Sequence, residues 1–160
     1  MVTPVTSAEL ILAKMIPYIL IGFMGFLISL GVCVFWFNIA VAGSVSLLLL
    51  LGLLFVISSL SMGMLISTFA QNQMQAMLGA MAVILPSVLL SGFMFPREAM
   101  PVVIGSIGLV LPITYFVDIL RCIVLKGIGA DLLMPDILPL IGLTVVLLAV
   151  ASLRVRKSLD

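Results

Sequence analysis

The feature that most constrains this chain is a long stretch without charge: residues 15–96 contain no Asp, Glu, Lys or Arg. A helix that crosses a hydrocarbon core of about 30 Å needs about 20 apolar residues, so this stretch can hold several crossings. Lipid offers the backbone no hydrogen-bond partners, which leaves helices or a closed barrel. The apolar runs are continuous and lack the alternation of barrel strands. The sequence therefore predicts an all-α integral membrane bundle.

Composition narrows the class of protein further. The 160 residues are 64% hydrophobic and 8% charged, whereas about a quarter of the residues of a soluble domain are charged. A net charge of +1 without a dense Lys/Arg block argues against nucleic acid, which is bound through its phosphates. Cys33 and Cys122 have no second Cys or His at metal-binding spacing, so we interpret both as packing residues and expect no metal site. Membrane lipid is the expected surrounding.

Four segments have the length and apolar character of a spanning helix. We predict them near residues 11–37, 45–69, 76–95 and 137–153, within a single membrane domain. Residues 97–131 are rich in prolines and charges and fit no simple span. We expect an outer re-entrant or interfacial helical hairpin there, and a further full crossing within this region stays open.

Charges at the end of the chain predict its orientation. Arg154, Arg156 and Lys157 follow the last predicted span, and short basic flanks of spanning helices face the cytoplasm. Four crossings then place both termini in the cytoplasm.

Small residues repeat within the second predicted span. Ser59, Gly63 and Ser67 recur at intervals of four and so line one face of the helix. A face of small side chains lets another helix approach closely. We therefore assign these three residues to helix packing.

The sequence lacks the patterns of an enzyme or of an ion-coupled carrier. It has no His, no G-x-x-x-x-G-K-[ST] phosphate loop and no nucleophile beside a base, so we expect neither catalytic nor cofactor-binding residues. Carriers driven by protons or sodium keep acidic residues at bilayer depth, and residues 15–96 contain none.

Three further patterns each have a functional and a plain interpretation. Asp118 and Arg121 can pair at i, i+3 on a helix, as a buried pair or as a solvated salt bridge. Pro17 and Pro86 lie inside predicted spans and fit hinges or static kinks equally well. Five methionines near the junction of the second and third spans could adapt to hydrophobic cargo or simply face lipid or core: Met62, Met64, Met74, Met77 and Met81.

Three stretches together resemble the membrane subunit of ABC-2 type transporters. They are Thr-Pro-Val-Thr at 3–6, Leu-Ser-Gly-Phe-Met-Phe-Pro-Arg-Glu-Ala-Met-Pro at 90–101, and Pro-Ile-Thr-Tyr-Phe with Leu-Arg-Cys-Ile-Val-Leu-Lys-Gly at 112–116 and 120–127. The middle stretch is the most specific. Within that family the chain is similar to bacterial inner-membrane permeases of drug or hydrophobic-compound efflux.

The resemblance implies a permease that works as a homo- or heterodimer and is powered by a separate subunit that binds ATP. It also implies roles for individual residues. Thr3, Pro4, Thr6 and Glu9 would trail a cytoplasmic coupling helix. The outer hairpin that covers the pathway would contain Phe95, Pro96, Glu98, Met100, Pro101, Pro112, Tyr115, Asp118 and Arg121.

Family members have two further spans and an outer domain before the point that corresponds to Met1. The chain is therefore expected to be the C-terminal part of such a permease, as a fragment or a truncated product, and to transport nothing by itself. The leading hypothesis is a permease subunit of an ATP-driven exporter of hydrophobic or drug-like compounds. The rival hypotheses are a small membrane scaffold that moves nothing and an ion-coupled carrier.

Overall fold

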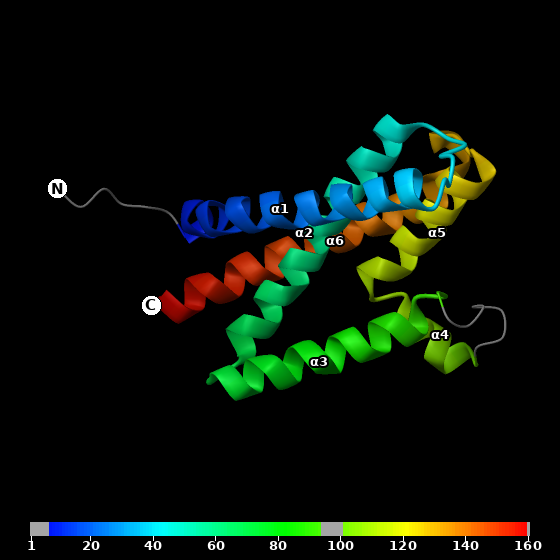
Figure 1. Cartoon of the computed structure of the whole chain (residues 1–160). Coiled ribbons are helices and arrows are strands. Elements are labelled where there is room, and N and C mark those ends of the chain that lie inside the picture. Colours follow the sequence, from blue (N-terminus) through cyan, green and yellow to red (C-terminus); the bar gives the residue numbers. More distant parts are fainter. Residues whose placement is uncertain (1–6, 94–100, 160) are drawn as a thin grey trace.

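The computed structural model describes residues 7–93 and 101–159 of the chain, all in helices and the loops between them. In chain order the helices are α1 (Ser7–Gly31, continued by the π-helical segment Val32–Trp36), α2 (Val45–Phe69), α3 (Gln73–Leu90), α4 (Val102–Gly108), α5 (Pro112–Lys126) and α6 (Ala130–Leu159). Figure 1 shows that α1 begins and α6 ends at the same end of the bundle. We call this the terminal end, and the opposite end, where α4 and α5 lie, the hairpin end.

Four of these helices are long and apolar enough to cross a membrane: Met15–Trp36, Val45–Phe69, Gln73–Leu90 and Ala130–Leu153. The predicted all-α bundle with four spanning helices is confirmed. Between α3 and α6 lie α4, with 7 residues, and α5, with 15 residues. At a rise of 1.5 Å per residue these helices reach about 10 and 22 Å, which is less than a hydrocarbon core of about 30 Å. Neither crosses a membrane alone.

The third spanning helix lies earlier in the chain than the predicted range 76–95. It begins at Gln73 because Asn72 caps it: the Asn72 Oδ1 atom accepts a hydrogen bond from the amide of Gln75 at 2.8 Å. It ends at Leu90, since Gly92 has a φ of 81° and leaves the helical path. The helix therefore includes Gln73 and Gln75, polar residues that precede the predicted range.

The last helix begins before the predicted residue 137. It starts at Ala130 and contains Pro135, which precedes the predicted span, and Pro139, which lies within it. Membrane helices tolerate proline where neighbouring groups satisfy the freed backbone atoms. Asp131 in the first turn also favours a start here, since its charge opposes the positive end of the helix dipole.

The core lies between α2, α5 and α6. Helix α2 is central and packs most extensively on α6, and also on α1 and α5. The buried cluster takes residues from three helices, namely Leu48 and Leu51 of α2, Ile119 and Ile123 of α5, and Leu133, Ile137 and Leu140 of α6. Helix α5 is thus fixed in the core along one face, although it is too short to span.

Three aromatic rings join α1, α2 and α5. Phe116 of α5 stacks on Phe55 of α2, with ring centroids 4.3 Å apart, and meets Phe26 of α1 edge-on at 5.8 Å. The Phe26 ring lies directly over Gly52 of α2, so closely that a Cβ atom at position 52 would collide with it. Gly52 therefore makes room for the ring that links α1 to the rest of the bundle.

We expect Gly52→Ala to destabilise the chain by about 1–3 kcal/mol, the usual cost of overpacking a filled site. Gly25→Ala is the matched control, because a Cβ atom at Gly25 meets nothing within 4 Å. There the better helix propensity of Ala should raise stability slightly. Thermal unfolding in the same detergent measures both variants. Equal stability of the two would contradict this packing.

Aromatic residues mark the hairpin end of α1. Phe35, Trp36 and Phe37 are 85%, 82% and 65% exposed. They lie where the first spanning helix stops, and amphipathic aromatic rings favour the boundary between hydrocarbon and headgroups. This triplet therefore indicates the depth at which the hairpin end meets the membrane surface.

Trp36 is the single tryptophan of the chain, so intrinsic fluorescence reports on it alone. In lipid vesicles, we expect bromine atoms near the headgroup end of the acyl chains to quench its emission more strongly than bromines near the bilayer centre. Trp36→Phe supplies the background signal. Stronger quenching from the bilayer centre would place the hairpin end of α1 inside the membrane and contradict the assignment.

Candidate functional site: an apolar groove closed by a helical hairpin

A groove of about 310 Å³ runs between α2 and α3 and ends on the start of α5. Cavities that hold small molecules are typically about 300–1,000 Å³. The lining residues come from three helices: Ser59, Met62, Gly63 and Ile66 of α2, Ala80, Val83, Ile84, Ser87 and Val88 of α3, and Pro112 and Ile113 of α5. The two spanning helices form its walls, and the hairpin closes it at one end.

The α3 wall was missed by the sequence analysis, although its signal is present. Ala80, Val83, Ile84, Ser87 and Val88 are spaced at i, i+3, i+4, i+7 and i+8, which is one face of a helix. The other faces of this helix are also largely apolar, so periodicity alone could not distinguish the face that lines the groove.

The groove is suited to apolar molecules and not to acid–base chemistry. None of its lining side chains is ionisable. The Ser87 hydroxyl is committed to its own helix, because it donates to the carbonyl of Val83 at 2.6 Å. Among the residues that the structure describes, no group of His, Cys, Asp or Glu could hold a metal ion. The groove can therefore recognise a molecule chiefly by its shape and by apolar contact.

Side chains of α5 fix the turn between the two helices of the hairpin. The Thr114 hydroxyl donates to the carbonyl of Gly108 at 2.7 Å, and the Tyr115 hydroxyl donates to the carbonyl of Leu109 at 2.9 Å. These carbonyls lie at the end of α4, and that of Gly108 also accepts a hydrogen bond from the amide of Leu111 at 3.1 Å. Pro112 begins α5 at a position that needs no backbone donor. These bonds hold the turn next to Pro112 and Ile113, the two α5 residues that line the groove.

The other end of α5 is bonded to the loop between α1 and α2. The amide of Ala42 donates to the carbonyl of Val124 at 3.2 Å. A Cβ atom at Gly43 would lie 2.8 Å from the carbonyl oxygen of Ile123, so glycine is needed for this approach. Gly127 closes the helix in the left-handed conformation with a φ of 63°. The loop and the hairpin are thus held together by backbone contacts.

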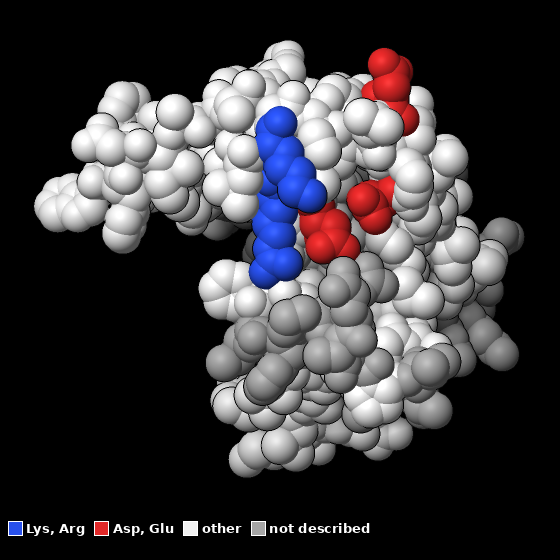
Figure 2. Space-filling model, turned by 90° about the vertical axis from the view of Figure 1, so that its right-hand side faces the viewer, with Lys and Arg blue, Asp and Glu red and all other residues white. Residues whose placement is uncertain are grey.

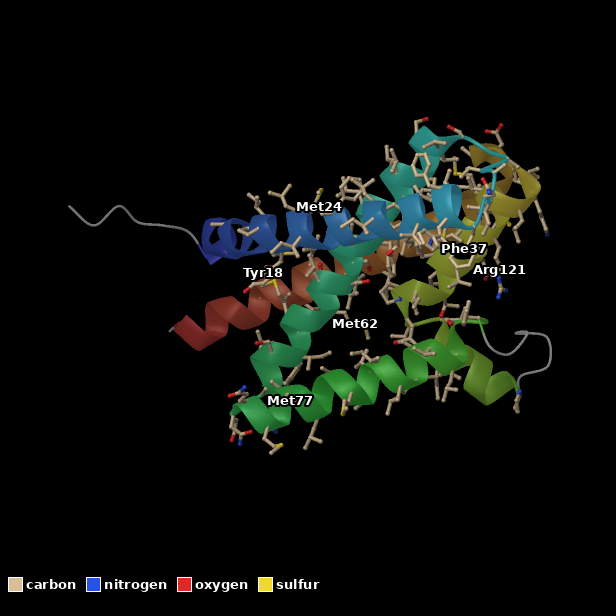
Figure 3. All side chains as sticks on the ribbon, in the orientation of Figure 1. Tyr18, Met24, Phe37, Met62, Met77 and Arg121 are labelled. Atoms are coloured by element: carbon tan, nitrogen blue, oxygen red, sulfur yellow. The ribbon has the colours of Figure 1, made fainter. Side chains whose placement is uncertain are left out.

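Arg121 connects α5 with the end of α3. Its Nη2 atom donates to the carbonyl of Gly92 at 2.9 Å and, more weakly, to that of Phe93 at 3.5 Å. Figure 3 shows Arg121 at the hairpin end. The pairing of Arg121 with Asp118 stays a prediction, and Asp118 itself is half-buried one turn earlier.

The charged side chains that the structure describes all belong to α5 and the start of α6. They are Asp118, Arg121, Lys126, Asp131 and Asp136. Figure 2 shows both signs of charge gathered on one face at the hairpin end. Charged groups are costly in hydrocarbon, so this face lies at the boundary between membrane and water.

Several residues predicted to be functional lie outside the described structure. These are the coupling residues Thr3, Pro4 and Thr6 and the hairpin residues Phe95, Pro96, Glu98 and Met100. Glu9 lies on α1, but its side chain is not described. Pro101 is exposed and precedes α4. Their assigned roles stay predictions.

The remaining candidates divide between the groove and the exposed surface. Ser59 and Gly63 line the groove, where a Cβ atom at Gly63 meets nothing within 4 Å, and Ser67 is exposed. Met62 also lines the groove, on the side of α2 that faces α3 (Figure 3). Met77 is exposed on α3, as are Met74 and Met81. Of these methionines only Met62 lines the groove.

Comparison with known proteins gives the family. Residues 1–125 match the family described as ABC-2 type transporter. The chain belongs to the ABC-2 type transporter family. The four apolar helices of spanning length agree with this membership.

Two relatives from Escherichia coli K12 are similar over nearly the whole chain. The probable multidrug ABC transporter permease YbhS is 37% identical over 99% of this chain and 42% of its own length. The inner membrane transport permease YhhJ is 30% identical over 99% of this chain and 43% of its own length.

A third relative from the same strain, the probable multidrug ABC transporter permease YbhR, is 30% identical over 90% of this chain and 39% of its own length. The chain thus spans about two fifths of these ABC-2 relatives. No solved structure matches it significantly.

Proposed function

We propose that the chain forms the C-terminal membrane part of a permease that exports a hydrophobic or drug-like compound from the cell. The observation that carries this proposal is the similarity to YbhS, a probable multidrug ABC transporter permease, over 99% of the chain. A scaffold without transport would need no groove, whereas a permease needs a path for its compound. Because the chain spans only two fifths of YbhS, we do not expect it to export by itself.

The groove is the proposed point at which the compound leaves the lipid. Its walls are two helices of spanning length, so it lies at membrane depth, where hydrophobic molecules are concentrated. Its lining is apolar, and a thioether such as that of Met62 adapts to molecules of different shape. This combination suits a compound recognised by size and apolar surface.

Export needs energy that this sequence does not provide. It contains no phosphate loop, so we propose that a separate ATP-binding subunit docks near Thr3, Pro4, Thr6 and Glu9 at the terminal end. We also propose a second permease chain, identical or different, as partner. Helix α3 has no fully buried residue of its own, which leaves apolar surface for such a contact.

The proposed location is the inner membrane, with both termini in the cytoplasm and the hairpin end outside. The basic flank Arg154, Arg156 and Lys157 at the terminal end supports this orientation. In that arrangement the hairpin lies over the outer end of the groove. ATP binding at the cytoplasmic side would then alternate the permease between inward and outward openings.

Affinity purification of the tagged chain from its native membrane tests the proposal. We expect mass spectrometry to find a co-purifying protein with a phosphate-binding loop, and we expect a trapped nucleotide state to change its association or conformation. Recovery of lipids and copies of the chain alone would favour the scaffold. Flux that follows a pH or sodium gradient would favour a carrier, and ATP-dependent efflux by the chain alone would contradict its partial role.

The path through the groove has its own test in the complete complex. Gly63→Leu should leave the fold intact, because the new side chain enters open space, and should lower export of a hydrophobic dye several-fold by filling the groove. Gly142→Leu on α6 is the matched control, since its Cβ atom also meets nothing within 4 Å. Equal export by the two variants would exclude the groove as the path.

A further inference from the structure

We propose that Arg121 is a positioning residue: it holds the hairpin end of α3 on the α4–α5 hairpin and thereby sets the width of the groove. The inference rests on the proposed function only in assigning a use to the groove. The connection between Arg121 and α3 is a property of the chain itself, so it can be tested without ATP, partner or transported compound.

Helix α3 needs such a connection because packing alone does not fix it. No residue of α3 is fully buried, whereas α2 buries six, among them Leu48, Leu51 and Val56. Much of the α3 surface is exposed and apolar, including Met77, Leu78, Met81, Ile84, Leu85, Val88 and Leu89. A helix with so few buried contacts is positioned chiefly by what holds its two ends.

The terminal end of α3 is held by close packing. Only residues 70–72 separate it from α2. A Cβ atom at Gly79 would lie 2.8 Å from the Cγ2 atom of Ile66, which shows how closely the two helices approach there. The groove opens beyond this contact, toward the hairpin end, so the separation of its walls depends on the other end of α3.

At the hairpin end, the chain leaves α3 at Leu90, and the backbone carbonyls that follow it need donors. Ser91 and Gly92 are buried, so water is not a ready partner for them. Arg121 supplies a guanidinium to the carbonyls of Gly92 and Phe93, at 2.9 and 3.5 Å. A cation at this point also opposes the negative end of the helix dipole.

The helix that carries Arg121 is itself anchored in the core. Ile119 and Ile123, on either side of Arg121 in the sequence, are completely buried in the core. A second contact supports the same junction, because a Cβ atom at Gly108 of α4 would lie 3.1 Å from the carbonyl oxygen of Leu90. The α3 wall of the groove and its end at Pro112 and Ile113 are therefore both attached to the α4–α5 hairpin.

Distances between spin labels on the full chain in lipid nanodiscs test this inference. One pair reports on the hairpin end, with labels at Leu89 of α3 and Leu132 of α6, both exposed. The other pair reports on the terminal end, with labels at Met77 and Val150, also exposed. Cys33→Ala and Cys122→Ala remove the native thiols.

Three variants are compared in this background. Arg121→Met removes the donors and keeps an apolar stem, whereas Arg121→Lys keeps a cation that can reach one carbonyl. Lys126→Met is the matched control, because it removes an exposed cation from the last turn of the same helix. If Arg121→Met fails to fold, Arg121→Gln carries the same comparison.

We expect Arg121→Met to broaden the distance distribution of the hairpin-end pair about two-fold and to leave the terminal-end pair unchanged, since only one end of α3 is released. The width of the hairpin-end distribution in Arg121→Lys should lie between those of Arg121→Met and the parent. In Lys126→Met it should equal that of the parent. An unchanged hairpin-end pair in Arg121→Met would overturn the inference. Equal broadening of both pairs would also overturn it, because Arg121 would then support the whole fold and not this junction.

Discussion

The structure depends on one constraint: backbone carbonyls at helix ends that pack against one another must find hydrogen-bond donors within the protein. Three such ends meet at the hairpin end of the bundle, those of α3, α4 and α5. Packing limits the access of water to their free carbonyls, and a buried carbonyl left without a donor would cost about 1–3 kcal/mol. The donors come from Arg121, from Thr114 and Tyr115, and from the amide of Ala42. These bonds connect α3, α4, α5 and the loop before α2 at the hairpin end.

Most of these bonds come from α5, whose buried and exposed faces make different contacts. One face is buried in the core through residues such as Ile119 and Ile123, which fixes the helix against α2 and α6. Elsewhere on α5, Pro112 lines the end of the groove, and the guanidinium of Arg121 donates to the carbonyl of Gly92 after α3. A helix too short to span thus organises the helices that do span, and the groove is a consequence of where it places α3.

The sequence predicts the architecture well because membrane crossing has a simple physical code. Length and apolarity identified four spans, and the second matches α2 at both ends. The predicted helix boundaries were wrong where a local hydrogen bond outweighs composition, as at Asn72. They were also wrong where a membrane helix tolerates proline, as at Pro135. The resemblance pointed to the family from three short stretches, and the match over residues 1–125 supports it.

The candidate site was predictable only in part. Ser59 and Gly63 were selected as a packing face and line the groove, whereas Ala80 and Ser87 across from them were missed. Nothing local in the sequence indicates that a groove separates α3 from α2. The end of α3 is instead positioned by its contacts with the hairpin, about thirty residues further along the chain. The bond from Arg121 to Gly92 could not be predicted either. Arg121 is conspicuous in the sequence, but its partner is a backbone carbonyl, which every residue has.

The most direct test of this account is hydrogen–deuterium exchange of the chain in lipid nanodiscs, read on peptides that cover residues 38–44 and 126–130. The amides of Ala42 and Ile128 lie in short loops, yet both donate to carbonyls of α5, at 3.2 Å each. If protein donors satisfy the helix ends at the hairpin end, these two amides exchange nearly as slowly as those inside α2. Exchange as fast as that of an exposed loop would show that water satisfies these helix ends, and the account would be wrong.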